Sequence, residues 1–204
     1  MLDESRNNYI CSLNVMENRA GICFADVSTG ELHATALSGE NASELAEQLK
    51  NELSRFSPKE ILLSQGVLSL SGLSEFMKER LGASAELLEE EKFNPASAAL
   101  AVSEQFHKTP EGLGLSGKPE IAGALGALLG YLKETERTGL ESMDELDLYS
   151  GEQYMKLNLT TRRNLELLET MRTKEKRGSL LWVLDRTRTA MGKRLIRNWV
   201  ERPL

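Results

Sequence analysis

The chain has 204 residues, of which 40% are hydrophobic and 27% are charged, an ordinary composition for one large or two small globular domains. No apolar run is long enough to span a bilayer, and the acidic, polar start MLDESRNNY lacks the pattern of a secretory signal. We therefore expect no membrane span and a cytoplasmic location.

The net charge of −6 is divided unevenly along the chain. Residues 154–204 contain 13 lysines and arginines against 5 acidic residues, whereas residues 1–153 contain 12 against 26. This change of sign predicts a domain boundary shortly before Tyr154. A basic segment is typical of nucleic-acid binding and equally of a solvated or interdomain face of a larger protein, and the charge leaves both alternatives open.

The first part of the chain predicts an α/β domain with a mixed sheet. Three strand-like runs joined by short polar turns indicate an antiparallel meander, and the middle run is apolar on both faces, as a central strand would be. Helices and strands then alternate, which adds parallel strands to one side of the sheet. The predicted strands cover residues 9–15, 21–28, 31–37, 60–64 and 83–88, and the predicted helices 41–56, 68–81, 95–106 and 119–137.

Local signals support several of these helices. Asn41 with Glu44 three residues later is a capping-box signature for the first helix. The helix predicted at 119–137 contains several glycines and alanines, which permit close packing against a neighbour. Residues 139–153 are acidic and irregular and are interpreted as a linker between domains.

The basic part of the chain predicts short helices. One covers residues 160–171, with Leu165, Leu168 and Met171 expected to be buried. After a charged loop at 172–178, residues 179–204 predict two more helices, the second with Thr189 as its N-cap. The apolar positions of that last helix recur at the spacing of one helical face and have no visible cover, so we expect upstream helices or another chain to cover them. They are Gly192, Leu195, Ile196, Trp199 and Val200.

One glycine-rich run approaches an ATP-binding motif. Residues 112–118, GLGLSGK, contain Gly-x4-Gly-Lys, but Pro119 stands where a serine or threonine must bind Mg²⁺. A helix, rather than a strand, is predicted before the run, so the phosphate cradle would not form. We predict a flexible loop between helices here.

The predicted layout is RNase H-like, a scaffold that often carries two-metal nucleases. Such enzymes need a carboxylate in the first strand and further carboxylates converging on it, but residues 9–15 contain none. Asp26 is alone on the second strand and Glu60 begins the fourth, so Asp26 is predicted to have a structural, hydrogen-bonded role. We assign no catalytic, cofactor-binding or metal-ligating residue.

The cysteines and histidines do not form a recognisable site either. Cys11 and Cys23 lie in separate predicted strands without metal-ligand spacing and are interpreted as reduced core residues. His33 and His107 are far apart, with no second ligand three or four residues away. We expect them on a strand surface or at a helix end.

Longer motifs resemble the MutS family of DNA mismatch repair proteins. The beginning of that family's helical lever, or core, domain is similar to residues 161–167 (TRRNLEL), 179–187 (SLLWVLDRT), 189–195 (TAMGKRL) and 199–204 (WVERPL). Its connector domain, an RNase H-like fold without nuclease activity, is similar to residues 6–9 (RNNY), 26–31 (DVSTGE), 112–115 (GLGL) and 130–135 (GYLKET).

The resemblance implies a connector domain at residues 1–140 and the first part of the lever at 141–204. It further implies a fragment of a larger ATPase, because the family's Phe-x-Glu mismatch-reading motif, DNA clamp and ATPase motif do not occur here. We accordingly expect no enzyme activity and no cofactor in this chain, with ATP and Mg²⁺ belonging to the full-length protein. Leu195, Ile196 and Trp199 become expected packing residues of the lever, exposed because the chain was cut.

The partners expected from the resemblance are those of the family. They are MutL, which docks on the connector in bacterial relatives, mismatched duplex DNA bound through absent domains, and a second copy in a full-length homodimer. The sequence does not identify the residues that contact MutL.

Overall fold

The computed structural model describes residues 7–135, 140–150, 155, 157 and 159–201. The chain divides into two compact units, Asn8–Ser150 and a second made of Met1–Asn7 with Gly151–Leu204. Each unit has its own hydrophobic clusters. None of the helices in the part that the structure describes is long and apolar enough to cross a membrane.

The sheet of the Asn8–Ser150 unit is mixed, as expected. Within the described residues it has six strands in the order β5-β4-β1-β2-β3-β6. The first three form the antiparallel meander, and β4 and β5 continue the sheet from β1 in parallel. The strands are β1 (Ile10–Met16), β2 (Arg19–Asp26), β3 (Glu31–Ser38), β4 (Glu60–Leu63), β5 (Ser84–Leu87) and β6 (Asp147–Leu148).

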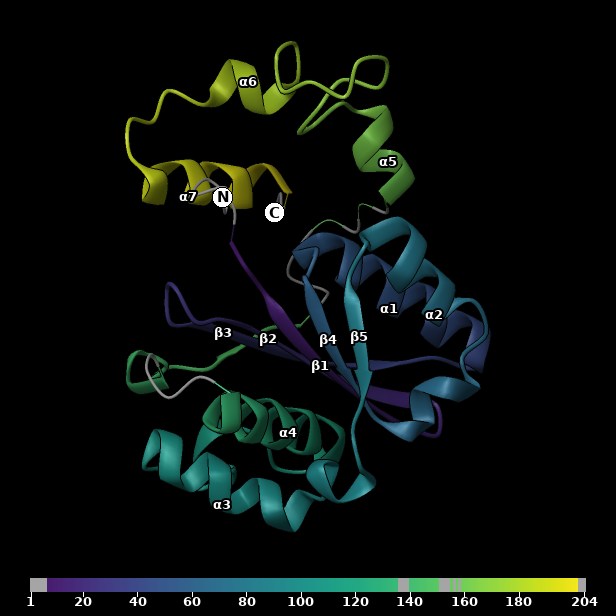
Figure 1. The fold of residues 1–204 in the computed structure, drawn as a ribbon, viewed down its shortest axis with the longest axis vertical. Coiled ribbons are helices and arrows are strands. Elements are labelled where there is room, and N and C mark those ends of the chain that lie inside the picture. The colour runs from purple at the N-terminus through teal and green to yellow at the C-terminus, as the bar shows by residue number, and fades with distance from the viewer. Residues whose placement is uncertain (1–6, 136–139, 151–154, 156, 158, 202–204) are drawn as a thin grey trace. The chain divides into compact units, whose positions relative to one another are not determined.

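Helices cover both faces of this sheet, which gives three layers. Figure 1 shows α1 (Ala42–Phe56) and α2 (Leu73–Glu75) on one face, and α3 (Pro95–Phe106) and α4 (Pro119–Thr135) on the other. The central strands are therefore buried on both sides, which explains why the sequence of β2 is apolar at nearly every position. The α/β fold class predicted from the sequence is confirmed.

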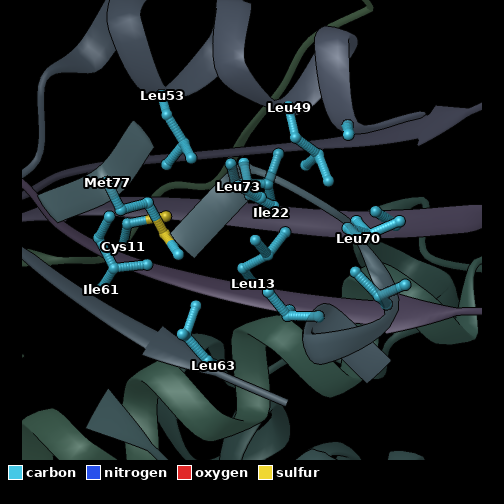
Figure 2. Close-up of a cluster of buried hydrophobic side chains, with 14 of the residues drawn as sticks. Cys11, Leu13, Ile22, Leu49, Leu53, Ile61, Leu63, Leu70, Leu73 and Met77 are labelled. Carbon is cyan, nitrogen blue, oxygen red and sulfur yellow. The ribbon is translucent and has the colours of Figure 1, made fainter. Parts of the chain in front are cut away.

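Figure 2 shows a largely aliphatic part of the core on the α1 side. Leu13 and Ile22 of the central strands meet Leu49 and Leu53 of α1, and all four are fully buried. Asn41 caps α1 as predicted, because its side chain accepts a hydrogen bond from the Glu44 amide at 3.0 Å. The Glu44 carboxylate in turn accepts from the amide of Glu40.

Glycines let α4 lie close to the opposite face. A Cβ atom built at Gly21 of β2 would lie 2.1 Å from the carbonyl oxygen of Glu120, and one at Gly126 would lie 2.4 Å from the Cβ of Ala98 in α3. The buried Glu120 side chain is paired with Arg19 at 2.6 Å. The close packing predicted from the small residues of this helix is confirmed.

The single helix predicted at 68–81 is wrong. The segment is broken into a 3₁₀ turn, Gln65–Ser69, the short α2 and a π-helical turn, Phe76–Leu81. Gly72 adopts a left-handed φ of 73° between the first two pieces and prevents a continuous helix. The apolar positions still point inward, with Leu73 and Met77 fully buried.

The expected linker contains structure. A 3₁₀ turn covers Leu140–Ser142, and β6 pairs in parallel with β3 through Asp147 and Leu148. Thr35 donates a buried hydrogen bond to the carbonyl oxygen of Tyr149 at 2.7 Å. These contacts bring the chain as far as Ser150 into the first compact unit, ten residues beyond the connector end expected at residue 140.

The second unit is helical but more broken than expected. Its helices are α5 (Leu159–Asn164), α6 (Leu180–Leu184) and α7 (Ala190–Glu201). The helix predicted at 160–171 stops early, and Glu166 adopts a left-handed φ of 47°. Of the three positions expected to be buried, Leu165 and Met171 are exposed and Leu168 is only partly buried, whereas Leu167 is buried instead.

Candidate interaction surface

Asp26 has a structural role. Its carboxylate is fully buried and accepts hydrogen bonds from the amide of Asn8, the amide of Ser28 and the hydroxyl of Ser28, at 3.2, 2.9 and 2.6 Å. It thereby closes the turn between β2 and β3. No group of three or more His, Cys, Asp or Glu that could hold a metal occurs in the described part of the chain.

The glycine-rich run does not resemble a phosphate-binding loop in space. It follows α3, which ends at Phe106 with His107 in the left-handed C-cap position, so a helix and not a strand precedes it. A 3₁₀ turn at Glu111–Leu113 and left-handed conformations at Gly114 and Gly117 lead directly into α4. The run is a connection between two helices, as predicted.

The two cysteines point to opposite faces of the sheet. Cys11 belongs to the cluster under α1 and Cys23 to the cluster under α4, and both are free thiols. Burial raises the pKa of both thiols well above the usual value, so both stay protonated and unreactive. His33 lies on β3 with Nδ1 2.8 Å from the Asp147 carboxylate, and His107 caps α3.

The second unit presents an apolar surface on α6 and α7. The hydrophobic cluster on the inner side of these helices is small, because the buried side chains that it contains among the described residues are Leu181 of α6, Val200 of α7 and the nearby Leu167. Thr189 caps α7 as predicted and accepts a hydrogen bond from the amide of Gly192 at 3.1 Å. The outer side chains are between 43% and 80% exposed, namely Leu180, Trp182, Val183, Leu184, Met191, Leu195 and Trp199.

Basic residues lie close in sequence to these apolar positions. Arg186, Arg188 and Lys193 are exposed, while Lys176 is paired with Asp185 at 2.6 Å. That ion pair, together with the hydroxyl and amide of Thr187, lowers the pKa of Asp185 to about 2. The surface therefore combines large apolar groups with positive charge, which is typical of a surface that another molecule covers.

One exposed position in the first unit was missed from the sequence. Leu100 of α3 is 70% exposed, the highest value among the large hydrophobic side chains described in that unit. The buried stripe of α3 consists of Ala98, Val102 and Phe106, four residues apart, and Leu100 falls on the other side of the helix. This spacing is the signal that could have identified it.

Comparisons with known proteins agree with this division of the chain. Residues 8–150 match the protein-family model for MutS domain II, and residues 160–204 match the one for MutS domain III. The first match ends at the last residue of the compact unit Asn8–Ser150. The second covers the described helices α6 and α7 with their apolar surface.

Curated relatives align with the whole chain. It is 37% identical over 204 residues to the DNA mismatch repair protein MutS of Ruminiclostridium cellulolyticum, and 38% identical over 203 residues to that of Caldanaerobacter subterraneus subsp. tengcongensis. The protein of the same name from Acetivibrio thermocellus is 37% identical over 204 residues. Each alignment covers 100% of this chain and 23% of the relative, so the chain spans about a quarter of their length. The chain belongs to the MutS family of DNA mismatch repair proteins, with a match to domain II followed by a match to domain III.

Proposed function

We propose that this chain is the connector and the first part of the lever of a mismatch repair ATPase, and that its role is mechanical. The observation that carries this proposal is the domain II match over residues 8–150 followed by the domain III match over 160–204. A sheet packed on both faces is a body that transmits displacement without deforming. The connector joins the mismatch-binding, lever and ATPase regions and relays conformational change between them.

The proposal assigns chemistry and DNA recognition to other parts of the family protein. ATP and Mg²⁺ bind its ATPase domain, mismatched duplex DNA binds its other domains, and the full-length protein acts as a homodimer in the cytoplasm. This chain by itself holds no cofactor and catalyses no reaction. Calorimetric titration with Mg-ATP should give no saturable binding, and matched and mismatched duplexes should bind equally; saturable ATP binding or a mismatch preference contradicts the proposal.

The proposal includes docking of MutL on the connector, and the exposed side of α3 is the place we assign to it. An exposed leucine in the middle of a helix is a suitable anchor for a partner's apolar pocket. Leu100→Glu should weaken binding of MutL to this chain about tenfold or more, measured by surface-immobilised titration. Leu68→Glu is the matched control, because Leu68 is 63% exposed but belongs to the turn on the α1 side. Equal effects of the two variants would exclude α3.

A second candidate function is general nucleic-acid binding by residues 154–204. The exposed arginines and lysine around α7 favour it. If basic side chains neutralise DNA phosphates, the logarithm of the binding constant for duplex DNA should fall with the logarithm of the salt concentration, with a slope of about −0.9 per phosphate contact. A Lys193→Glu variant should reduce that slope by roughly one contact if the segment binds DNA. A salt-independent or absent interaction excludes this function.

A further inference from the structure

The outer edge of β5 is an unpaired strand edge. The amide of Ser84 bonds the carbonyl oxygen of Lys59 at 2.9 Å, and the amide of Leu88 bonds that of Leu63 at 3.0 Å. Because successive residues of a strand point their backbone groups to opposite sides, the amides and carbonyls of Ala85 and Leu87 face away from β4. No other described strand pairs with them, and all four residues of β5 are exposed.

The two faces of this edge differ in chemistry. Ala85 and Leu87 pair with Ile61 and Leu63, which belong to the core under α1, so their side chains lie on that face. Leu87 is 49% exposed there and offers apolar surface at the edge. Glu86 lies on the opposite face, the α4 side.

The α4 side of the edge is acidic. Glu60 accepts a hydrogen bond from the Tyr131 hydroxyl at 2.5 Å, and this bond, followed by burial and by the charges of Glu60 and Glu86, raises the pKa of Tyr131 to about 12. The chain leaves β5 through Glu89, Glu90 and Glu91, which are all exposed. A strand added to β5 therefore meets apolar surface on one face and negative charge on the other.

We infer that β5 is a docking edge for an extended segment of a partner protein, in which basic residues alternate with apolar ones. Strand addition satisfies the outward backbone groups of Ala85 and Leu87, and the side-chain alternation of the added strand matches the two faces. A second copy of this chain is a poor occupant, because antiparallel self-pairing brings glutamates against glutamates. This surface is independent of the α3 face around Leu100.

The test uses a fluorescein-labelled peptide, Lys-Val-Lys-Val-Lys-Val, titrated with the whole chain and followed by anisotropy. We expect saturable binding, with the amide signals of Ala85 and Leu87 shifting and becoming protected from hydrogen exchange. The peptide Glu-Val-Glu-Val-Glu-Val and a backbone N-methylated copy of the basic peptide should not bind. Equal binding of the N-methylated peptide overturns strand addition, because that peptide keeps its charge but cannot donate hydrogen bonds.

Variants of the protein test the same edge. Ala85→Pro removes the outward amide donor of residue 85 and leaves the hydrogen bonds to β4 in place, a replacement that sheet edges tolerate. This variant should no longer bind the basic peptide. Glu86→Lys should weaken the basic peptide roughly fivefold. Glu111→Lys, the same charge change on an exposed turn before α4, should have no effect.

Three further outcomes overturn the inference. They are the absence of peptide binding to the unmodified chain, equal effects of Glu86→Lys and Glu111→Lys, and a dimer in sedimentation experiments that Ala85→Pro dissolves. Absence of peptide binding would mean that the acidic residues protect the edge from pairing. A dimer that Ala85→Pro dissolves would mean that a second copy of the chain occupies the edge. If Ala85→Pro does not fold, the N-methylated peptide gives the same answer without a mutation.

Discussion

At the scale of single residues, α4 can lie close to α3 because Gly126 has no side chain. Gly126 touches Ala98 so closely that an added Cβ would lie 2.6 Å from its Cα atom, whereas Gly130, one turn later in α4, has nothing within 4 Å. Replacing each glycine with alanine therefore separates the effect of packing on stability from the effect of helix propensity.

Gly126→Ala should destabilise the Asn8–Ser150 unit by about 1–3 kcal/mol, because α3 or α4 must move to admit the methyl group. Gly130→Ala should be neutral or stabilise by up to about 1 kcal/mol, because alanine favours a helix. Urea denaturation followed by circular dichroism measures both. If both variants lose stability, the contact with Ala98 is not the reason why alanine is unfavourable on this side of α4.

Asp185 gives a prediction about pH. Its folded pKa of about 2 lies below the ordinary value, first because of the Lys176 hydrogen bond and then because of Thr187. A depressed carboxyl pKa stabilises the folded state above the unfolded pKa, and this contribution is lost as the pH falls from about 4 to about 2. Carboxyl titration by NMR should show the low pKa, and Lys176→Met should raise it towards 3.8. An unchanged value in that variant assigns the shift to Thr187 instead.

At the scale of elements, the strands and long helices follow from the sequence, and the broken elements do not. Strand-like runs between polar turns locate β1 to β5, although all four residues of β5 are exposed. Apolar spacing and helix-start signals locate α1, α3 and α4, which bury apolar side chains. The interruption at Gly72 and the reversal at Glu166 depend on single left-handed residues that periodicity does not detect. At the surface, the spacing of apolar residues in the sequence indicated the stripe of α7. The exposure of Leu100 and Leu87 could not be predicted in this way, because it depends on which face of α3 and of β5 the neighbouring elements cover.

Strand β6 was not predicted, because a strand of two residues is too short to show an alternation of apolar and polar residues. Its position depends on tertiary bonds: the amide of Tyr149 bonds the carbonyl oxygen of Ala34 at 3.1 Å, and the hydroxyl of Thr35 bonds the carbonyl of Tyr149. The His33 side chain adds its contact with Asp147. A long-range pairing of this kind has no local sequence signal.

Thr35→Val should loosen β6 without unfolding the sheet. The substitution keeps the shape of the side chain but leaves the buried carbonyl of Tyr149 without its hydroxyl donor, which costs about 1–3 kcal/mol locally. Hydrogen exchange at the Tyr149 amide should accelerate roughly tenfold or more. The amide of Ile22 in the central strand is the internal control, and equal acceleration there would mean that the whole sheet is destabilised.

For the whole molecule, the division into two compact units predicts two unfolding transitions. The cluster of the second unit contains three buried side chains, whereas the first unit is built around two larger clusters. Both tryptophans, Trp182 and Trp199, belong to the second unit. Tryptophan fluorescence therefore reports on the second unit alone, and we expect its transition at a lower urea concentration than the loss of the sheet signal.

Two leucine variants test this independence. Leu181→Ala removes a buried side chain from the second unit and should lower the midpoint of the fluorescence transition, and Leu125→Ala should lower only the transition of the sheet. Each loss is about 2–5 kcal/mol when the cavity does not collapse. If either variant shifts both transitions together, the two units unfold as one cooperative body. Separate transitions instead mean that the helices of the second unit can rearrange while the sheet of the first unit stays folded, as the mechanical role that we propose requires.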